Sequence, residues 1–134
     1  MSEALYGESI KALAATPPRR LERADARHSL DNPLCGDRVT VEVVLEAGRT
    51  AAFGHEVKGC LLCKAAAAVV ARHAVGLDEQ AAAGLLEQAR SLLLQGEAPA
   101  LPDLAVFAPV APHKSRHGCV LLPFKALVKA LSSA

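Results

Sequence analysis

Residues 38–57 read RVTVEVVLEAGRTAAFGHEV, and this stretch decides the fold. From Arg38 to Glu46 apolar and polar side chains alternate, with one break at Val44, which is typical of a half-buried strand. Ala47-Gly48 supplies a tight reversal. The chain then returns over residues 49–57 with four residues in step: Ala51, Phe53, His55 and Val57. We therefore expect an antiparallel hairpin, with a bulge at Gly54.

Two further elements are predicted before the hairpin. Apolar residues at helical spacing predict a short helix over Ser2 to Ala14. Thr16-Pro17-Pro18 ends it, because proline disfavours helical backbone in the residue before it. An edge strand is expected at residues 26–29, ahead of Asn32-Pro33, which favours an extended or turning backbone.

Three helices are expected after the hairpin. Gly59-Cys60 opens an alanine-rich helix that runs to His73 and is predicted to be the central helix. Asp78 is a good N-cap for a second helix over residues 79–95, which Gly96 ends. The third begins near His117.

Prolines shape the last part of the chain. Residues 104–116 are predicted to be a connector, because Pro109 and Pro112 interrupt it. Pro123 is compatible with the last helix if it lies within the first turn, where its missing N–H costs nothing.

Composition indicates one globular domain over residues 1–134. The chain is 51% hydrophobic, which is ample for a core. Fifteen Lys and Arg nearly balance fourteen Asp and Glu, giving a net charge of +1, so nucleic-acid binding is not expected. One cluster of arginines alternates with acidic residues, which favours a solvated face or a protein-docking patch. Its members are Arg19, Arg20, Arg23 and Arg27.

The compartment follows from features that the sequence lacks. No stretch approaches the roughly 20 apolar residues that span a bilayer, and residues 1–15 lack the pattern of a secretory signal. We therefore expect a cytoplasmic protein that has no membrane partner. In that reducing compartment the four cysteines are predicted to be thiols or ligands instead of disulfides.

Three cysteines and one aspartate predict a metal or cluster site. Cys35 and Asp37 lie two residues apart, so in an extended segment they project to the same side, and Gly36 lets the backbone bend between them. Cys60 and Cys119 each lie near a predicted helix start, where the helix dipole lowers the pKa of a thiol. Thiolates bind a metal or cluster of this kind firmly. The aspartate oxygen binds it more weakly, so it is the ligand from which a bound metal or cluster can be released.

These residues resemble a known family. The run Asn32-Pro33-Leu34-Cys35-Gly36-Asp37, the strand pair, Gly59-Cys60 and the run CVLLPFKAL over 119–127 are similar to the U-type iron-sulfur cluster assembly scaffolds. This family comprises IscU, SufU and the N-terminal part of NifU. The long interval between Cys60 and Cys119 resembles the SufU branch. The resemblance covers about residues 1 to 131.

The resemblance implies an α+β fold, in which helices cover one face of a small antiparallel sheet of about three strands. It also implies a site made of Cys35, Asp37, Cys60 and Cys119. In such proteins this site builds a labile [2Fe-2S] cluster from iron and from persulfide sulfur supplied by a cysteine desulfurase, or it binds zinc instead. Apo iron-sulfur proteins are the implied acceptors.

The sequence departs from the family pattern in three places. The Leu-Pro-Pro-Val-Lys motif that recruits an Hsp70-type chaperone in the Isc branch is replaced by residues 108–114, APVAPHK, so this partner is not implied. The histidine before the last cysteine is Gly118 here, which leaves His117 as a reserve ligand. Cys63 stands where SufU-type sequences carry serine. It could displace Asp37, resolve a persulfide on Cys60 or pack as a small apolar residue, and buried packing is favoured.

Three functions remain open from the sequence. The first is a scaffold that carries a cluster without being an enzyme. The second is a zinc-dependent sulfurtransferase partner whose first persulfide acceptor is Cys35. The third is a structural zinc domain used for protein contact.

Overall fold

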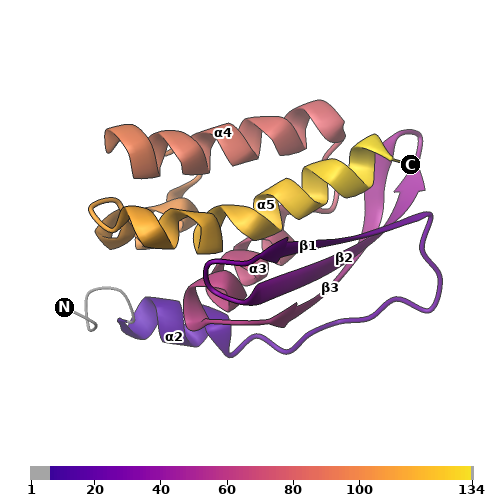
Figure 1. The fold of residues 1–134 in the computed structure, drawn as a ribbon. Helices are drawn as coiled ribbons and strands as arrows, with labels where there is room; N and C mark the ends of the chain where they lie inside the picture. The colour runs from indigo at the N-terminus through magenta and orange to yellow at the C-terminus, as the bar shows by residue number, and fades with distance from the viewer. Residues whose placement is uncertain (1–6, 134) are drawn as a thin grey trace.

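The computed structural model describes residues 7–133 (Figure 1). The part of the predicted first helix over residues 2–6 lies outside these residues. The elements in chain order are α2 Glu8–Ala14, β1 Ala26–Asn32, β2 Asp37–Glu46, β3 Arg49–Lys58, α3 Leu61–His73, α4 Glu79–Gln95, the 3-10 helices η1 Pro102–Val110 and η2 Lys114–Arg116, and α5 His117–Ser132.

The three strands form one antiparallel sheet in the order β1-β2-β3. The predicted hairpin is confirmed, since β2 and β3 pair from Arg38 opposite Lys58 to Glu46 opposite Arg49. The edge strand is longer than predicted, because β1 pairs with β2 as far as Asn32, which lies opposite Asp37. The sheet therefore ends at the segment that carries the first candidate ligands.

The bulge predicted at Gly54 is wrong. Gly54 pairs regularly with Glu42, and the register instead shifts between Val44 and Leu45, so that Ala51 is the extra residue and is exposed. Gly54 is needed for a different reason. A Cβ there would lie 2.7 Å from the backbone oxygen of Arg19, which pairs with His55 at the edge of β3.

The predicted arginine cluster is largely paired within the protein. Arg20 Nε lies 3.1 Å from Glu42 Oε1, and Arg27 Nε lies 3.7 Å from Glu42 Oε2. The backbone N–H of Leu21 also donates to Glu42 Oε1, at 3.0 Å. Glu42 is buried as a result, although strand alternation placed it on the polar face. The cluster fastens residues 20–27 to the sheet, while its arginine side chains stay partly exposed, as on a solvated face.

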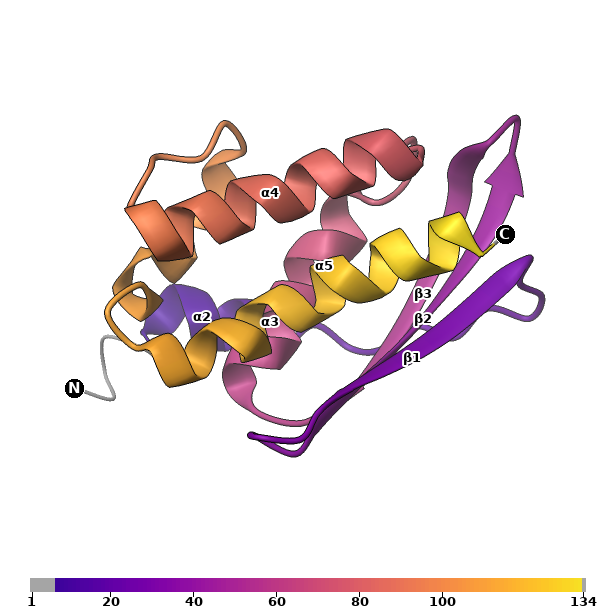
Figure 2. The same cartoon turned by 45° about the horizontal axis from the view of Figure 1, so that its top comes forward.

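The helices lie on one face of the sheet, as expected for an α+β fold (Figures 1 and 2). α5 packs on β1 and β2, α3 packs on β3 and on α5, α2 lies against α3, and α4 lies against α5. The buried inner face of the sheet includes Val39, Val41, Val43, Phe53 and His55. The alanine run of α3 is buried on nearly every side, because alanine lets neighbouring backbones approach closely. The prediction that this is the central helix is met only in part, because α5 packs against more elements: β1, β2, α3, α4 and η2.

The caps of α4 agree with the sequence. Asp78 Oδ1 accepts the N–H of Ala81 at 2.8 Å, and Gly96 ends the helix with a left-handed φ of 68°.

The predictions based on prolines are partly wrong. Most of the predicted connector is helical, because Leu104, Phe107 and Val110 recur every three residues and so share one buried face of the 3-10 helix. Pro123 lies inside α5, beyond its first turn. Among residues 7–133, no helix is long and apolar enough to cross a membrane.

Candidate metal centre

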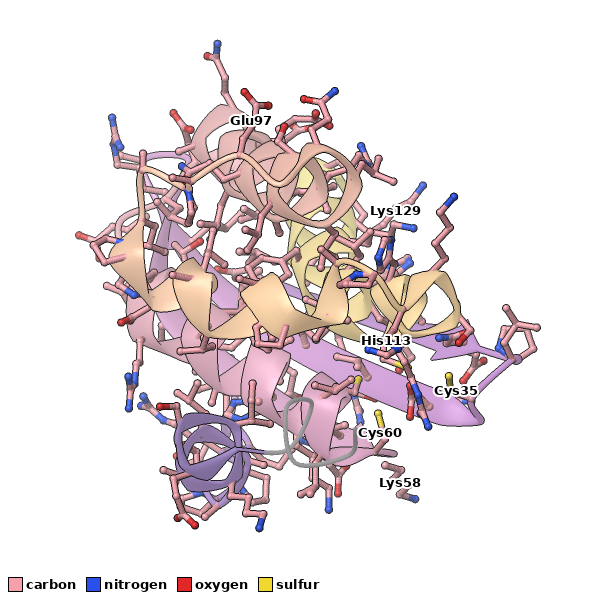
Figure 3. All side chains as sticks on the ribbon, turned by 90° about the vertical axis from the view of Figure 1, so that its left-hand side faces the viewer. Cys35, Lys58, Cys60, Glu97, His113 and Lys129 are labelled. Atoms are coloured by element: carbon pink, nitrogen blue, oxygen red, sulfur yellow. The ribbon has the colours of Figure 1, made fainter. Side chains whose placement is uncertain are left out.

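The candidate ligands gather at one end of the sheet. Cys35 lies in the turn between β1 and β2, and Asp37 is the first residue of β2. Cys60 is the N-cap of α3, and Cys119 lies in the first turn of α5. Figure 3 shows Cys35 and Cys60 at the same end of the molecule. Three segments that are distant in sequence therefore supply the four ligands, with Cys35 and Asp37 coming from the same one.

Three of the four candidate ligands form a compact group. The ligand atoms of Cys35, Asp37 and Cys119 all lie within 4.8 Å of one another. The thiol of Cys119 lies 2.9 Å from the sulfur of Cys35. This is longer than a disulfide bond, which measures about 2.05 Å, and all four cysteines are free thiols. The group could hold a metal ion.

Asp37 joins the strand to α3. Its side chain is buried, and its Oδ1 accepts the backbone N–H of Cys60 at 2.9 Å. Its Oδ2 lies 3.8 Å from the sulfur of Cys60. Gly59 makes this approach possible, since a Cβ at Gly59 would collide with Asp37 Oδ1 and lie 2.9 Å from Asp37 Cγ. The buried carboxylate and the start of α3 therefore depend on each other.

Cys60 stands beside the group of three without belonging to it. A hydrogen bond from the Cys119 thiol and the backbone N–H groups of Cys63 and Leu62 lower the pKa of Cys60 to about 6. Burial and the nearby Asp37 act in the opposite direction. The expectation that a helix start favours the Cys60 thiolate is met.

Cys119 behaves in the opposite way. The neighbouring Cys60 thiol, burial, and the nearby Cys35 and Asp37 all raise the pKa of Cys119. The sequence predicted the same electrostatic help for both thiols, and for Cys119 this was wrong. Of these two thiols, Cys60 is therefore the one that ionises more readily.

Neither of the two reserve ligands belongs to the group of three. Cys63 is buried in the hydrophobic core, and burial is the main reason why its pKa is raised. His117 is also buried, and its Nε2 lies 2.8 Å from the carbonyl oxygen of Ala111. The packing interpretation of Cys63 has the better support, and His117 is engaged by the backbone before α5.

Asn32 is a site residue that sequence reasoning missed. Its Oδ1 accepts the N–H of Leu34 at 3.2 Å, and its Nδ2 lies 3.8 Å from the sulfur of Cys119. The Asn-Pro pair indicated only a turn, and nothing in the sequence pointed to the other end of the chain.

The donor set fits a thiophilic metal or an iron-sulfur cluster. Thiolates are ligands for zinc and for iron-sulfur clusters, and zinc also accepts carboxylate oxygen. Two sulfurs bound at about 2.3 Å to one tetrahedral metal lie about 3.8 Å apart. The sulfurs of Cys35 and Cys119 are closer than this, so a bound metal requires them to separate by about 1 Å. The turn that carries Cys35 gives one of them room to move.

Two solved structures are similar to this chain over nearly its whole length. One is the N-terminal part of a nitrogen-fixing NifU-like protein from Brucella abortus. It is 28% identical with a TM-score of 0.90, and the match covers 98% of this chain and 94% of that chain. The other is a putative iron-sulfur cluster assembly scaffold protein for the SUF system from Fervidobacterium islandicum AW-1. It is 25% identical with a TM-score of 0.88, and the match covers 98% and 99%.

A third structure supports the fold alone. This hypothetical protein is 23% identical with a TM-score of 0.84, and the match covers 97% of this chain and 98% of that chain. No protein-family model and no curated protein sequence matches the chain.

Proposed function

Because this chain has the fold of the U-type iron-sulfur cluster assembly scaffolds and resembles their SufU branch, we propose that it is such a scaffold. It binds iron, accepts sulfur, and passes a labile [2Fe-2S] cluster to apo acceptor proteins. The single observation that carries this proposal is the meeting of Cys35, Asp37 and Cys119 within 4.8 Å. We propose the reducing cytoplasm as its location, because the thiols remain available there.

The ligands proposed for this cargo are Cys35, Asp37, Cys60 and Cys119. Cys60 is the ligand best prepared to bind, because its lowered pKa favours the thiolate near neutral pH. Asp37 is the proposed exit, since a hard oxygen ligand holds soft iron-sulfur cargo less firmly than a thiolate does.

Sulfur arrives in the proposed reaction as a persulfide on a cysteine desulfurase. A thiolate of this chain attacks the outer sulfur, so that a new persulfide forms here and the desulfurase cysteine leaves as a thiolate. Each transferred sulfur then needs two electrons to become sulfide, which an external thiol or electron carrier supplies. Cys35 is the proposed acceptor because it is only partly buried and lies in a turn.

The surface beside the thiols suits contact with a partner. Leu34 has 87% of its surface exposed and precedes Cys35, and Leu61 is 38% exposed and follows Cys60. We propose that the desulfurase covers these two leucines while the persulfide is transferred, because the transfer requires direct contact between the sulfurs.

Metal and sulfide analysis tests the proposal. The protein is purified without oxygen and incubated with a cysteine desulfurase, cysteine, ferrous iron and a thiol reductant, and cluster absorbance is followed. Transfer to an apo-ferredoxin is then measured. We expect about two iron and two sulfide per protein in the wild type. A Cys119→Ser variant should assemble much less cluster.

A second candidate is a zinc-dependent sulfurtransferase partner. The observation that favours it is the placement of Cys35, which can leave a tetrahedral zinc to accept persulfide while its three partners stay. Stoichiometric zinc, no reconstitutable cluster and faster turnover of the desulfurase would support this candidate and rule out the first.

A further inference from the structure

We propose that Asn32 is a positioning residue of the candidate metal centre, which joins the Cys35 turn to Cys119 and donates a hydrogen bond to the Cys119 sulfur. The inference rests on the proposed function only in taking Cys35 and Cys119 as ligands. It is carried by the contacts that Asn32 makes with the Cys35 turn and with the start of α5.

Asn32 holds the turn that carries Cys35. The backbone carbonyl of Asn32 accepts the N–H of Cys35 at 3.2 Å and the N–H of Gly36 at 2.8 Å. Gly36 has a φ of 71°, a left-handed conformation that glycine adopts without strain. Asn32 Oδ1 accepts the N–H of Leu34, as in an Asx turn. Asn32 thus organises the backbone on which Cys35 sits.

The turn also fixes the orientation of the Asn32 side-chain amide. Only the oxygen of an amide can accept the Leu34 N–H, so the NH₂ group must point the other way. It points at the sulfur of Cys119, 3.8 Å away and 87 residues further along the chain. The turn therefore determines that the NH₂ group of Asn32, and not its oxygen, faces the Cys119 sulfur.

The residue before Cys119 also lies close to Asn32. A Cβ at Gly118 would lie 3.0 Å from Asn32 Nδ2, closer than ordinary van der Waals contact. Glycine at this position lets the first turn of α5 approach the amide. The departure noted in the sequence, glycine in place of histidine, now has a structural consequence.

The chemical effect follows from the nature of the donor. A neutral N–H next to sulfur stabilises the thiolate and restrains its direction without adding a competing ligand. Residues that orient metal ligands in this way typically change metal affinity by about 10- to 100-fold when they are substituted.

Three variants separate this role from a purely structural one. Asn32→Asp keeps the oxygen that accepts the Leu34 N–H but replaces the donor with a second oxygen. Asn32→Ala removes both groups. Asp31→Asn is the matched control, because Asp31 is the preceding exposed residue, and its side chain contacts Arg38 at 3.5 Å.

Two measurements read the result. Cobalt(II) is titrated into the metal-free proteins, and the sulfur-to-cobalt charge-transfer absorbance gives affinity and thiolate ligation. Oxidised glutathione is then added to the metal-free proteins, and the Cys35–Cys119 disulfide is quantified by peptide mass spectrometry. That reaction converts two thiols and one glutathione disulfide into one protein disulfide and two glutathione thiols.

We expect Asn32→Asp to bind cobalt about tenfold or more weakly, to form the disulfide more slowly, and to resemble Asn32→Ala in both measurements. Asp31→Asn should match the wild type. The inference is overturned if Asn32→Asp behaves as the wild type, since the turn alone would then explain Asn32. If Asn32→Asp does not fold, Gly118→Ala decides by the same measurements, and unchanged values in that variant also overturn the inference.

The outcome is independent of the proposed function. Weaker cobalt binding in Asn32→Asp, together with a wild-type protein that assembles no cluster, would refute the scaffold function and leave the role of Asn32 intact. If instead the wild type and Asn32→Asp assemble cluster equally well and bind cobalt equally, the scaffold function would be supported and the role of Asn32 refuted.

Discussion

The carboxylate of Asp37 accepts the backbone N–H of Cys60 at 2.9 Å, so the proposed oxygen ligand also anchors the start of the helix that carries a proposed thiolate ligand. The oxygen that contacts the Cys60 sulfur, Oδ2, is the other one of the pair. Asp37 can therefore present one oxygen to a metal while the other holds α3.

Substitution of Asp37 should separate these two roles. We expect Asp37→Ala to retain the cluster but to deliver it more slowly to apo-ferredoxin, because the weak oxygen ligand is missing. Its free energy of unfolding should fall by about 1–2 kcal/mol, since the Cys60 N–H loses its acceptor. Asp37→Asn keeps an acceptor for this N–H and should lose less stability. Faster transfer from Asp37→Ala would contradict the proposed exit.

Gly59 is predicted to be intolerant of any side chain. Gly59→Ala places a methyl group against the Asp37 carboxylate, and such overpacking costs about 1–3 kcal/mol. It should also weaken cobalt binding, because Asp37 must move. Gly84→Ala is the control, since Gly84 is exposed in α4 with open space at its Cβ, and alanine should stabilise that helix by about 1 kcal/mol. Chemical denaturation measures the stability of both variants. Equal stability of Gly59→Ala and wild type would show that Asp37 is not held there.

Cys63 should prove to be a packing residue. Cys63→Ala is expected to bind metal with unchanged stoichiometry, with a loss of about 1 kcal/mol of stability from the small cavity. Cys63→Ser should be less stable, because it buries a hydroxyl group in the apolar core. Elemental analysis after anaerobic purification, with thermal unfolding, tests both variants. A Cys63→Ala protein that loses its metal would return Cys63 to the ligand set.

Glu42 is expected to make a contribution to stability that is lost in acid. The hydrogen bond from Arg20, the Leu21 N–H and the charges of Arg20 and Arg27 hold its pKa below the ordinary value of 4.5, against the effect of burial. Since the folded pKa is the lower one, this stabilisation is present above about pH 4.5 and is lost as the pH falls through the folded pKa.

Glu42→Gln should therefore lower the stability of the metal-free protein at pH 7 by about 1 kcal/mol and flatten its dependence on pH below about 5. Urea unfolding between pH 3 and pH 7, roughly the range over which the carboxylate titrates, measures this effect. Glu46→Gln, at the exposed end of β2, is the control and should change neither value. An unchanged pH profile in Glu42→Gln would refute the assignment.

Much of the fold could be predicted because local patterns determine it. The alternation over residues 38–46 and the caps Asp78 and Gly96 each depend on neighbouring residues, and all agree with the structure. The bulge was misplaced because close approach by Arg19 also requires a glycine at position 54, which a single sequence cannot distinguish from a bulge. The 3-10 helix η1 was missed because its period of three resembles neither an α-helix nor a strand.

The candidate site could be predicted in composition but not in its internal order. Helix starts at Cys60 and Cys119 were readable, whereas the opposite pKa directions of the two thiols come from their contact with each other and from burial. Asn32 was missed for the same reason, because its sulfur partner is 87 residues away and only the folded chain brings them together.

Cys35 and Cys119 stand 84 residues apart in the chain, and their sulfurs meet at 2.9 Å. Cargo held between them acts as a removable cross-link that closes most of the chain into a loop. A permanent bond over a loop of this length stabilises a protein by up to about 4–5 kcal/mol through the entropy of the unfolded chain. Delivery of the cargo therefore removes this cross-link. The empty protein should unfold more readily than the loaded protein, and proteases should cleave it faster.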